Sequence, residues 1–358
     1  MNDQLFYDAL DLLKELIATP SVSRSESAAA DIVYAFAVKN IPGVTPQRIG
    51  NNIYIADPTY DATRKTLLLN SHIDTVPAAS GWTRDPFRPT FIEEDGKLYG
   101  LGSNDAGASL VSLLAAFRCL VSSPRSYNLI FVASAEEEVS GKDGLTAVLP
   151  VLPKVDCAIV GEPTGMRPAI AEKGLMVLDC TAHGVAGHAA RNEGVNAIYN
   201  AIDSINRLRN FKFEKESPTL GPVKVSTTII NGGTKHNVVP DTCQFTVDVR
   251  TTAAYSNLEA LEILRGVAGR DIDVIPRSTR LNPSSISADH PIVKRFEMLG
   301  LEPFGSPTLS DGALMPWQKV KAGPGQSSRS HTPDEYILIN EIREAIEIYI
   351  KILTNLNI

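Results

Sequence analysis

Histidine and carboxylate side chains follow three short apolar segments of this chain. They are His72 and Asp74 after residues 66–69, Glu136, Glu137 and Glu138 after residues 129–133, and Glu162 after residues 157–160. Short, continuous apolar runs are typical of buried parallel strands. In open α/β sheets, ligands collect beyond the carboxyl ends of such strands. We therefore expect these side chains to face one crevice and to form a metal site.

Two further candidate ligands lie in segments that contain several glycines. Asp105 lies within residues 100–107, just ahead of an apolar helical stretch at residues 110–121. The glycines allow the backbone there to pass close to a ligand. His331 lies within residues 323–335, directly before the last predicted helix. For His331, a surface loop histidine without a ligand is the alternative interpretation.

The pair His72 and Asp74 suits a metal ligand and its support. A metal-bound imidazole usually donates its other ring N–H to a carboxylate, which fixes the tautomer. His72 is then the ligand and Asp74 the residue that orients it. The alternative is a histidine at a strand end that an aspartate caps in a turn.

Three consecutive glutamates close the second apolar run. Like charges in a cleft repel each other and resist ionising together, and a bound dication removes that difficulty. The alternative is a solvated acidic turn, which is how most charge runs behave. For residues 136–138 alone, both interpretations stay open.

Length, charge and cysteine usage limit the class of protein. At 358 residues, two domains are the natural expectation, and a hydrophobic fraction of 43% is typical of a globular protein. The formal charge of -7, without a Lys/Arg-rich run, argues against nucleic-acid binding. The start carries no basic region before an apolar core, and no apolar run reaches about 18 residues, so we expect a soluble, cytoplasmic protein without a membrane partner. The cysteines occur singly, which predicts four buried thiols rather than disulfides, at Cys119, Cys157, Cys180 and Cys243.

The order of predicted elements indicates an α/β domain with an insertion. Amphipathic helices at residues 3–17 and 25–38 precede strands and helices that alternate to about residue 162. From about residue 173 the order becomes β-α-β-β-α-β, which is that of a ferredoxin-like α+β domain. Predicted helices at residues 291–299 and 341–353 return to the first domain. We predict a mostly parallel sheet covered by helices in residues 1–172 and 283–358, and an inserted domain in residues 173–282.

Five segments together resemble the dizinc aminoacylase and carboxypeptidase family, the M20-type metallopeptidases. The resemblance is strongest to its acetylornithine deacetylase and succinyl-diaminopimelate desuccinylase members, and the fold it implies is that of a metal-dependent exopeptidase. It covers the chain in order and in spacing, through the segments 72–74, 102–105, 135–138, 161–164 and 330–335.

The resemblance implies a role for each residue of the site. His72 and Glu162 bind one metal ion, Glu138 and His331 bind the other, Asp105 bridges the two, and Glu137 is the general base. Two dications about 3.5 to 4 Å apart lower the pKa of a shared water and polarise the scissile carbonyl. The implied cofactors are two divalent ions, zinc by analogy with the family, although cobalt and manganese also suit imidazole and carboxylate ligands.

The inserted domain resembles the lid and dimerisation domain of the family. Within residues 184–191, His188 matches a histidine that stabilises the oxyanion in the neighbouring subunit's site, which implies a homodimer through the inserted domains. Asn237 and Arg250 match segments that contact substrate, and the planar fork of Arg250 suits an α-carboxylate. An internal salt bridge from Arg250 to Asp248 or Asp241 is the alternative.

The predicted function is that of a binuclear metal-dependent amidohydrolase of N-acyl amino acids. The first substrate is N-acetylornithine, as in arginine biosynthesis. The alternatives are an N-succinyl-ornithine or N-succinyl-diaminopimelate desuccinylase, a metallo-dipeptidase, and a non-catalytic scaffold or binding relative. The segment Asp105-Ala106-Gly107 lacks the lysine of the Asp-Met-Lys-Gly that is common in the family. The ligand set is unaffected, but a positive charge near Asp105 is missing, so the substrate cannot be inferred from close analogy with other members.

Overall fold

The chain forms two compact units in a computed structural model that describes residues 3–358. Unit 1 contains the chain up to Ile170 together with Ile286–Phe304 and Ser310–Ile358, and unit 2 contains Ala171–Ser285 and Gly305–Leu309. Residues 1 and 2 of the first predicted domain lie outside the described residues. Residues 305–309, which the sequence prediction assigns to the first domain, belong to unit 2.

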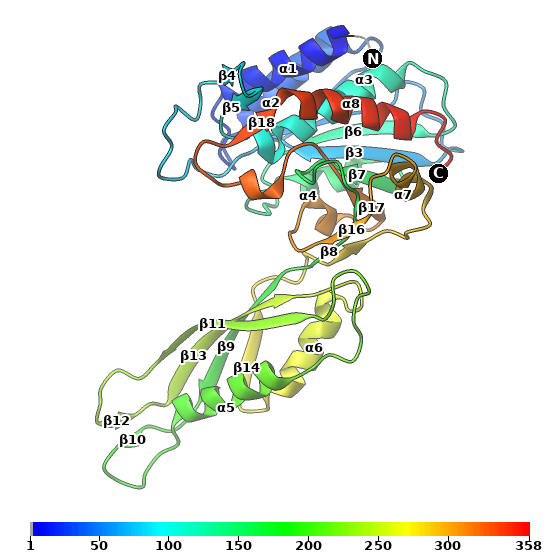
Figure 1. Ribbon diagram of the computed structural model, residues 1–358. Helices are drawn as coiled ribbons and strands as arrows, with labels where there is room; N and C mark the ends of the chain where they lie inside the picture. The colour runs from blue at the N-terminus through cyan, green and yellow to red at the C-terminus, as the bar shows by residue number, and fades with distance from the viewer. Residues whose placement is uncertain (1–2) are drawn as a thin grey trace. The chain divides into compact units, whose positions relative to one another are not determined.

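A mostly parallel sheet forms the centre of unit 1 (Figure 1). The strands β6 (Asn128–Ser134), β3 (Thr66–His72), β7 (Cys157–Val160) and β17 (Gln318–Lys321) are neighbours in this order, and all three pairs are parallel. The predicted fold class is therefore confirmed. The sheet continues on one side with antiparallel β2 (Asn52–Ile55) and β1 (Gln47–Ile49), and on the other with β8 (Ala169–Glu172).

Both faces of the central strands are buried, which explains their continuous apolar runs. Leu67 and Leu69 of β3 point into the larger core of the unit, while Leu68 points into a smaller core on the opposite face. None of the three leucines is exposed to solvent. Each contributes about 1.5–3 kcal/mol through burial.

Helices cover the sheet of unit 1 on both sides. The larger core contains the apolar faces of α1 (Asp3–Ile17), α2 (Ser27–Asn40), α3 (Ala108–Val121) and α8 (Ile339–Leu353), and Figure 1 shows α1, α3 and α8 above the sheet. The smaller core includes α4 (Leu145–Val148). The remaining helices and strands of this unit are short: α7 (Pro291–Glu297), β4 (Thr90–Ile92), β5 (Lys97–Tyr99) and β18 (Tyr336–Leu338), and β16 (Phe304–Ser306) has only its first residue in this unit.

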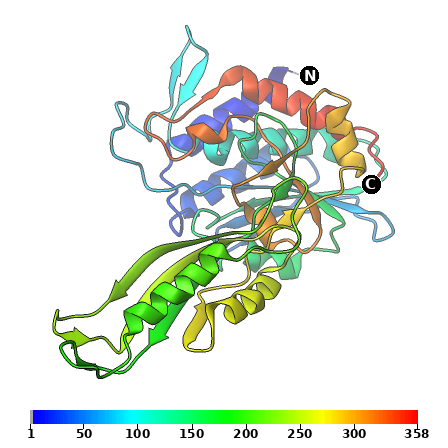
Figure 2. The ribbon, with the colours of Figure 1, turned by 60° about the horizontal axis from the view of Figure 1, so that its bottom comes forward.

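Unit 2 has the predicted β-α-β-β-α-β order. Its elements are β9 (Met176–His183), α5 (Ala197–Asn210), β11 (Lys224–Gly232), β13 (Thr242–Arg250), α6 (Asn257–Ala268) and β14 (Ile272–Pro276), with the short strands β10 (Gly187–His188), β12 (Val238–Val239) and β15 (Ser284–Ser285). The sheet order β11-β13-β9-β14 is antiparallel throughout. The two helices lie side by side, as Figure 2 shows. A capping box starts α6, in which the Ser256 side chain and the Glu259 carboxylate satisfy each other's backbone N–H groups.

The structure corrects one thiol prediction. All four cysteines are free, and Cys157, Cys180 and Cys243 are buried as predicted, but Cys119 is exposed. Cys119 lies in the last turn of α3, where the helix is no longer fully enclosed, as the partly buried Arg118 beside it also shows.

One segment of the described residues is long and apolar enough to cross a membrane. It is Ser103–Val121, which includes α3, and 78% of its most apolar stretch of 18 residues is buried inside the protein. Its apolar character matches its place in the larger core, where Leu110, Leu113 and Leu114 are fully buried.

Candidate metal centre

The parallel strands bring three of the predicted segments to one edge of the unit 1 sheet. His72 is the last residue of β3 and lies opposite Ser134, the last residue of β6. Glu137 and Glu138 follow β6 directly, and Glu162 follows β7. Because the carboxyl ends of parallel strands lie at the same edge, side chains distant in sequence converge there.

The two ring nitrogens of His72 have different partners. Nε2 lies 3.3 Å from Oδ1 of Asp105 and 3.8 Å from Oε1 of Glu162. Nδ1 lies 2.9 Å from the backbone carbonyl of Asp74 and 3.5 Å from its carboxylate. When Nδ1–H donates to Asp74, the lone pair of Nε2 faces Asp105 and Glu162, which is the tautomer that a metal ligand requires.

His331 approaches the same aspartate from the other side. Its Nε2 lies 3.0 Å from Oε2 of Glu138 and 3.6 Å from Oδ2 of Asp105. The two oxygens of Asp105 therefore face two different histidines, Oδ1 towards His72 and Oδ2 towards His331. This is the arrangement expected of a carboxylate that bridges two metal ions.

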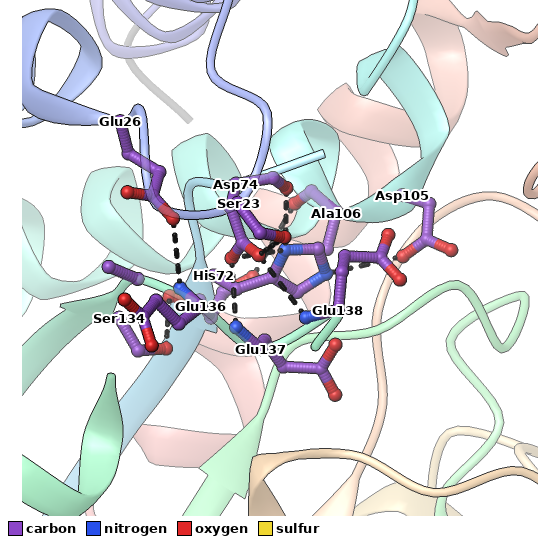
Figure 3. Close-up of polar contacts among 12 residues, drawn as sticks. Ser23, Glu26, His72, Asp74, Asp105, Ala106, Ser134, Glu136, Glu137 and Glu138 are labelled. Carbon is purple, nitrogen blue, oxygen red and sulfur yellow. Dashed lines mark hydrogen bonds and ion pairs between the residues drawn. The ribbon is translucent and has the colours of Figure 1, made fainter. Parts of the chain in front are cut away.

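Asp74 contacts both His72 and the glutamate segment that follows β6, and holds both in place. Its carboxylate accepts the backbone N–H of Glu137 at 3.1 Å, that of Glu138 at 3.2 Å, and the hydroxyl of Ser23 at 2.6 Å. Figure 3 shows these bonds converging on Asp74 beside the imidazole of His72. One buried carboxylate thus connects the end of β3 with the segment after β6.

Clustered negative charge shifts the pKa values of the site. Burial and the charge of Glu162 raise the pKa of Glu137 well above its ordinary value. Burial and the charge of Asp105 do the same for Glu162. Burial opposes protonation of His72, but its hydrogen bonds to Asp105 and Asp74 raise the pKa of the imidazole well above its usual value. The hydrogen bond to Glu138 raises the pKa of His331 to about 9. The site therefore favours bound positive charge.

The donor set fits divalent metal ions. Donor atoms within 4.8 Å of one another occur in two groups that share His72, one with Glu137 and Glu162 and the other with Asp105 and Glu138. In the part of the chain that the structure describes, the ion pairs of Asp105, Glu138 and Glu162 involve only the two histidines. Imidazole and carboxylate donors without thiolate suit zinc, cobalt and manganese.

Glu137 differs from its neighbour Glu138 in its surroundings. Its backbone is fixed by Asp74, but within residues 3–358 its carboxylate makes no hydrogen bond, whereas Glu138 pairs with His331. A partly buried carboxyl group with a raised pKa beside a metal site is suited to accept and return a proton.

The remaining predicted residues lie in unit 2. His188 is exposed on β10, and its Nδ1 accepts the backbone N–H of Ala190 at 3.1 Å. Asn237 is also exposed, and its backbone carbonyl accepts the N–H of Ala189. Arg250 donates to both oxygens of Asp248, at 2.9 and 3.2 Å, which is the alternative arrangement that its sequence context left open. Substrate contact by these residues stays a prediction.

Two buried carboxylates near the site were not assigned a role from the sequence. Glu335 lies in the segment 330–335 that carries the family resemblance, and it accepts the backbone N–H groups of Asn104 and Asp105. Asp311 accepts the hydroxyl of Ser134 at 2.5 Å, and burial raises its pKa to about 6. The segment 310–312 also resembles a site segment of the family, but residue type and spacing gave neither acid a role.

Known proteins share both the sequence pattern and the fold. The model of peptidase family M20/M25/M40 matches residues 68–355. An acetylornithine deacetylase of Klebsiella pneumoniae is 29% identical, with 95% of each chain covered. Among solved structures, the aminopeptidase PepT of Bacillus cereus has a TM-score of 0.77 at 17% identity and covers 97% of this chain and 98% of its own. A dinuclear metal-binding peptidase of the M20 family from Bacillus subtilis has a TM-score of 0.73 at 15% identity, with 98% of each chain covered.

Proposed function

The chain belongs to peptidase family M20/M25/M40, a family of metallohydrolases, and from this premise we propose that it removes the acyl group from an N-acyl amino acid, with N-acetylornithine as the first candidate. The placement of Asp105 between His72 and His331 carries the proposal, because its two carboxylate oxygens face the two histidines, which is what a ligand shared by two metal ions requires. The relative named acetylornithine deacetylase supports the substrate, since the similarity extends over 95% of both chains. On this basis the protein acts in the cytoplasm, in arginine biosynthesis.

Five side chains are proposed to hold two divalent ions. His72 and Glu162 hold one, Glu138 and His331 hold the other, and Asp105 bridges them. When bound, the ions lower the pKa of the attacking water and polarise the scissile carbonyl. We propose zinc, with cobalt and manganese as metals that the same donors accept.

The protein side chains then handle the proton. Glu137 accepts a proton from the attacking water and later donates it to the amine nitrogen of the leaving amino acid. Asp74 holds Glu137 and His72 in their relative positions, because its carboxylate accepts the backbone N–H of Glu137 and its backbone carbonyl contacts Nδ1 of His72.

A Glu137→Gln variant tests the assignment of the base. Amide for carboxylate keeps the size of the side chain but removes the proton acceptor, so hydrolysis should fall about 10²–10⁴-fold while both metal ions stay bound. The matched control is Glu136→Gln, since the hydrogen bonds of this adjacent glutamate, among the described residues, are made by its backbone: its N–H donates to Glu26 and its carbonyl accepts from Gly141. Activity of Glu137→Gln equal to that of the control would show that the base is a different group.

Release of ornithine from N-acetylornithine and from N-succinylornithine separates the substrate candidates. Arg329, the cation nearest in sequence to His331, donates to both oxygens of Glu341 at 2.6 and 3.1 Å. Because that guanidinium already has a carboxylate partner, it does not favour a succinyl group, and the acetyl substrate is expected to be preferred. A metal-loaded enzyme that cleaves neither would overturn this substrate class, and a chain that binds no metal would support the non-catalytic alternative.

We also propose a homodimer through unit 2, with His188 acting in the partner's site. β11 is an edge strand with exposed Ile229 and Ile230, and the neighbouring α5 exposes Tyr199, 66% accessible. Exposed apolar edge strands favour pairing between chains. Ile230→Lys should shift the protein to a monomer in sedimentation velocity, whereas Ile275→Lys on the opposite edge strand should not. A dimer that survives Ile230→Lys would argue for a different interface.

A further inference from the structure

Glu335 contacts the backbone that carries the bridging aspartate. Its carboxylate Oε1 accepts the N–H of Asn104 at 2.8 Å and the N–H of Asp105 at 2.9 Å, and Oε2 accepts the N–H of Gly102 at 3.3 Å. Only 2% of Glu335 is exposed, so few water molecules can replace these bonds. Three donors from one short segment therefore point at one buried side chain.

Glu335 also belongs to the segment that carries His331. The two residues lie four positions apart, between the turn at Ser327–Arg329 and β18. The backbone carbonyl of Glu335 accepts the N–H of Gly100, which adds a bond between the same two segments. A shift of the Glu335 side chain would thus move the Asp105 segment relative to the His331 segment.

Asn104 fastens the same two segments from the other direction. Its side chain donates to the carbonyl of Gln326 at 3.1 Å and to the hydroxyl of Ser330 at 3.2 Å, and accepts the N–H of Gln326 at 3.0 Å. The backbone N–H of Asn104 is the group that donates to Glu335. The contacts of Asn104 and Glu335 thus form one connected network that joins the segment of Asp105 to the segment of His331.

We propose that Glu335 is a positioning residue that sets the orientation of the bridging ligand Asp105 towards both metal positions. It accepts the N–H of Asp105 itself, and only three residues separate it along the chain from His331, the candidate ligand on the other side of Asp105. Residues that orient metal ligands typically change metal affinity 10–100-fold when they are mutated. The inference rests on the proposed binuclear centre, and it adds the group that aligns its shared ligand.

The geometry makes graded variants informative. Glutamine in the same conformation keeps an oxygen for the two shorter bonds to Asn104 and Asp105 and places an amide group opposite the N–H of Gly102. Alanine removes all three acceptors. Glu335→Gln should therefore fold and lose less metal affinity than Glu335→Ala.

Asp334 supplies the matched control. Its carboxylate anchors the same segment, but it accepts N–H groups from Thr83 and Arg84 at 3.0 and 3.2 Å and does not contact residues 102–105. Asp334→Asn therefore perturbs the segment without touching the bridging ligand. If packing of the segment alone mattered, Asp334→Asn and Glu335→Gln would have equal effects.

Calorimetric titration of the full-length, metal-free chain with Zn²⁺ or Co²⁺ tests the proposal, together with amide hydrogen exchange of residues 102–105. We expect Glu335→Ala to bind metal about 10–100-fold more weakly than wild type, Glu335→Gln to lie in between, and Asp334→Asn to match wild type. Exchange at residues 102–105 should accelerate in the same order. Wild-type affinity in Glu335→Ala, with wild-type protein binding two ions, would overturn the role of Glu335 alone. Failure of wild-type protein to bind any metal would overturn this role together with the proposed centre.

Discussion

Asp74→Ala is the substitution that tests most directly how the metal centre is assembled. The wild-type carboxylate accepts the backbone N–H groups of Glu137 and Glu138 and the hydroxyl of Ser23, and faces Nδ1 of His72. Asp74 is only 1% exposed. Alanine removes every acceptor except the backbone carbonyl, so one change releases the glutamate segment and loosens His72 at the same time.

The structure sets the expected size of the effect. Each buried donor that loses its partner costs about 1–3 kcal/mol. Because the segment at Glu137 and Glu138 is partly buried and water can replace some contacts, we expect the free energy of unfolding of the metal-free protein to fall by about 2–4 kcal/mol. The backbone carbonyl of Asp74 still accepts from His72, so metal affinity should fall by about 10–100-fold rather than vanish.

Urea denaturation of the metal-free protein and calorimetric metal titration measure the two effects separately. The control is Asp57→Ala, which removes a buried carboxylate that accepts the N–H groups of Leu129 and Thr59 and pairs with Arg125. It should lower the free energy of unfolding at least as much, because Arg125 is left unpaired, yet leave metal affinity unchanged. Equal metal affinities for Asp74→Ala and wild type would refute the argument that Asp74 positions the ligands.

Three further predictions concern the charge, the thiols and a turn. The metal-free protein should lose stability as pH rises from about 6.5, the pKa of histidine in the unfolded chain, to about 9, the pKa of His331 in the folded protein. Protonated His331 stabilises the fold, and this contribution is complete below about pH 6.5 and is lost as His331 deprotonates. Calorimetric melting at successive pH values should show this slope, and His331→Gln should reduce it. A thiol reagent should label Cys119 alone in the folded protein, as mass spectrometry of its peptides would reveal, and labelling of all four thiols before unfolding would contradict the burial found here. Gly325→Ala should lower the melting temperature, since residue 325 has φ of +83° and a Cβ there would collide with Oδ1 of Asn104; an unchanged melting temperature would show that the turn can rearrange.

The sequence was sufficient to predict the central strands that position the candidate metal ligands. β3, β6 and β7 are buried on both faces, so their apolar runs are continuous and visible without the structure. Strands β4, β5 and β18 were not predicted because each has only three residues and none of these strands is buried along its whole length. They pair with one another in a separate sheet, outside the central sheet. β18 pairs with β5 from a distant part of the chain, which no local pattern records, and β4 and β5 form a hairpin whose strands are too short for an alternating pattern to be visible.

The sequence predicted that Asp74 orients His72, but the backbone contacts of Asp74 and Glu335 could not be predicted, for a related reason. Asp74 accepts from a backbone group 63 residues away, and Glu335 from one 230 residues away. The donor in each case is a backbone N–H, which every residue except proline carries, so the partner leaves no trace in the residue types. The histidine and carboxylate ligands, in contrast, are chemically distinctive and follow recognisable strand ends.

The formal charge of the centre argues for two dications rather than one. Asp105, Glu137, Glu138 and Glu162, whose carboxylates belong to the two groups of donor atoms, together carry -4 when ionised, and both histidines are neutral when they act as ligands. One dication leaves -2 in a largely buried space, whereas two leave no net charge. Asp74 and Glu335 stand outside these groups and accept two and three backbone N–H groups. Hydrogen bonds to a carboxylate favour its charged form, whereas burial opposes it. Burial is outweighed at Asp74, whose pKa lies below its usual value, but it prevails at Glu335 and raises that pKa to about 8. The four carboxylates of the donor groups therefore match the charge of two divalent ions, and the supporting carboxylates are not part of that balance.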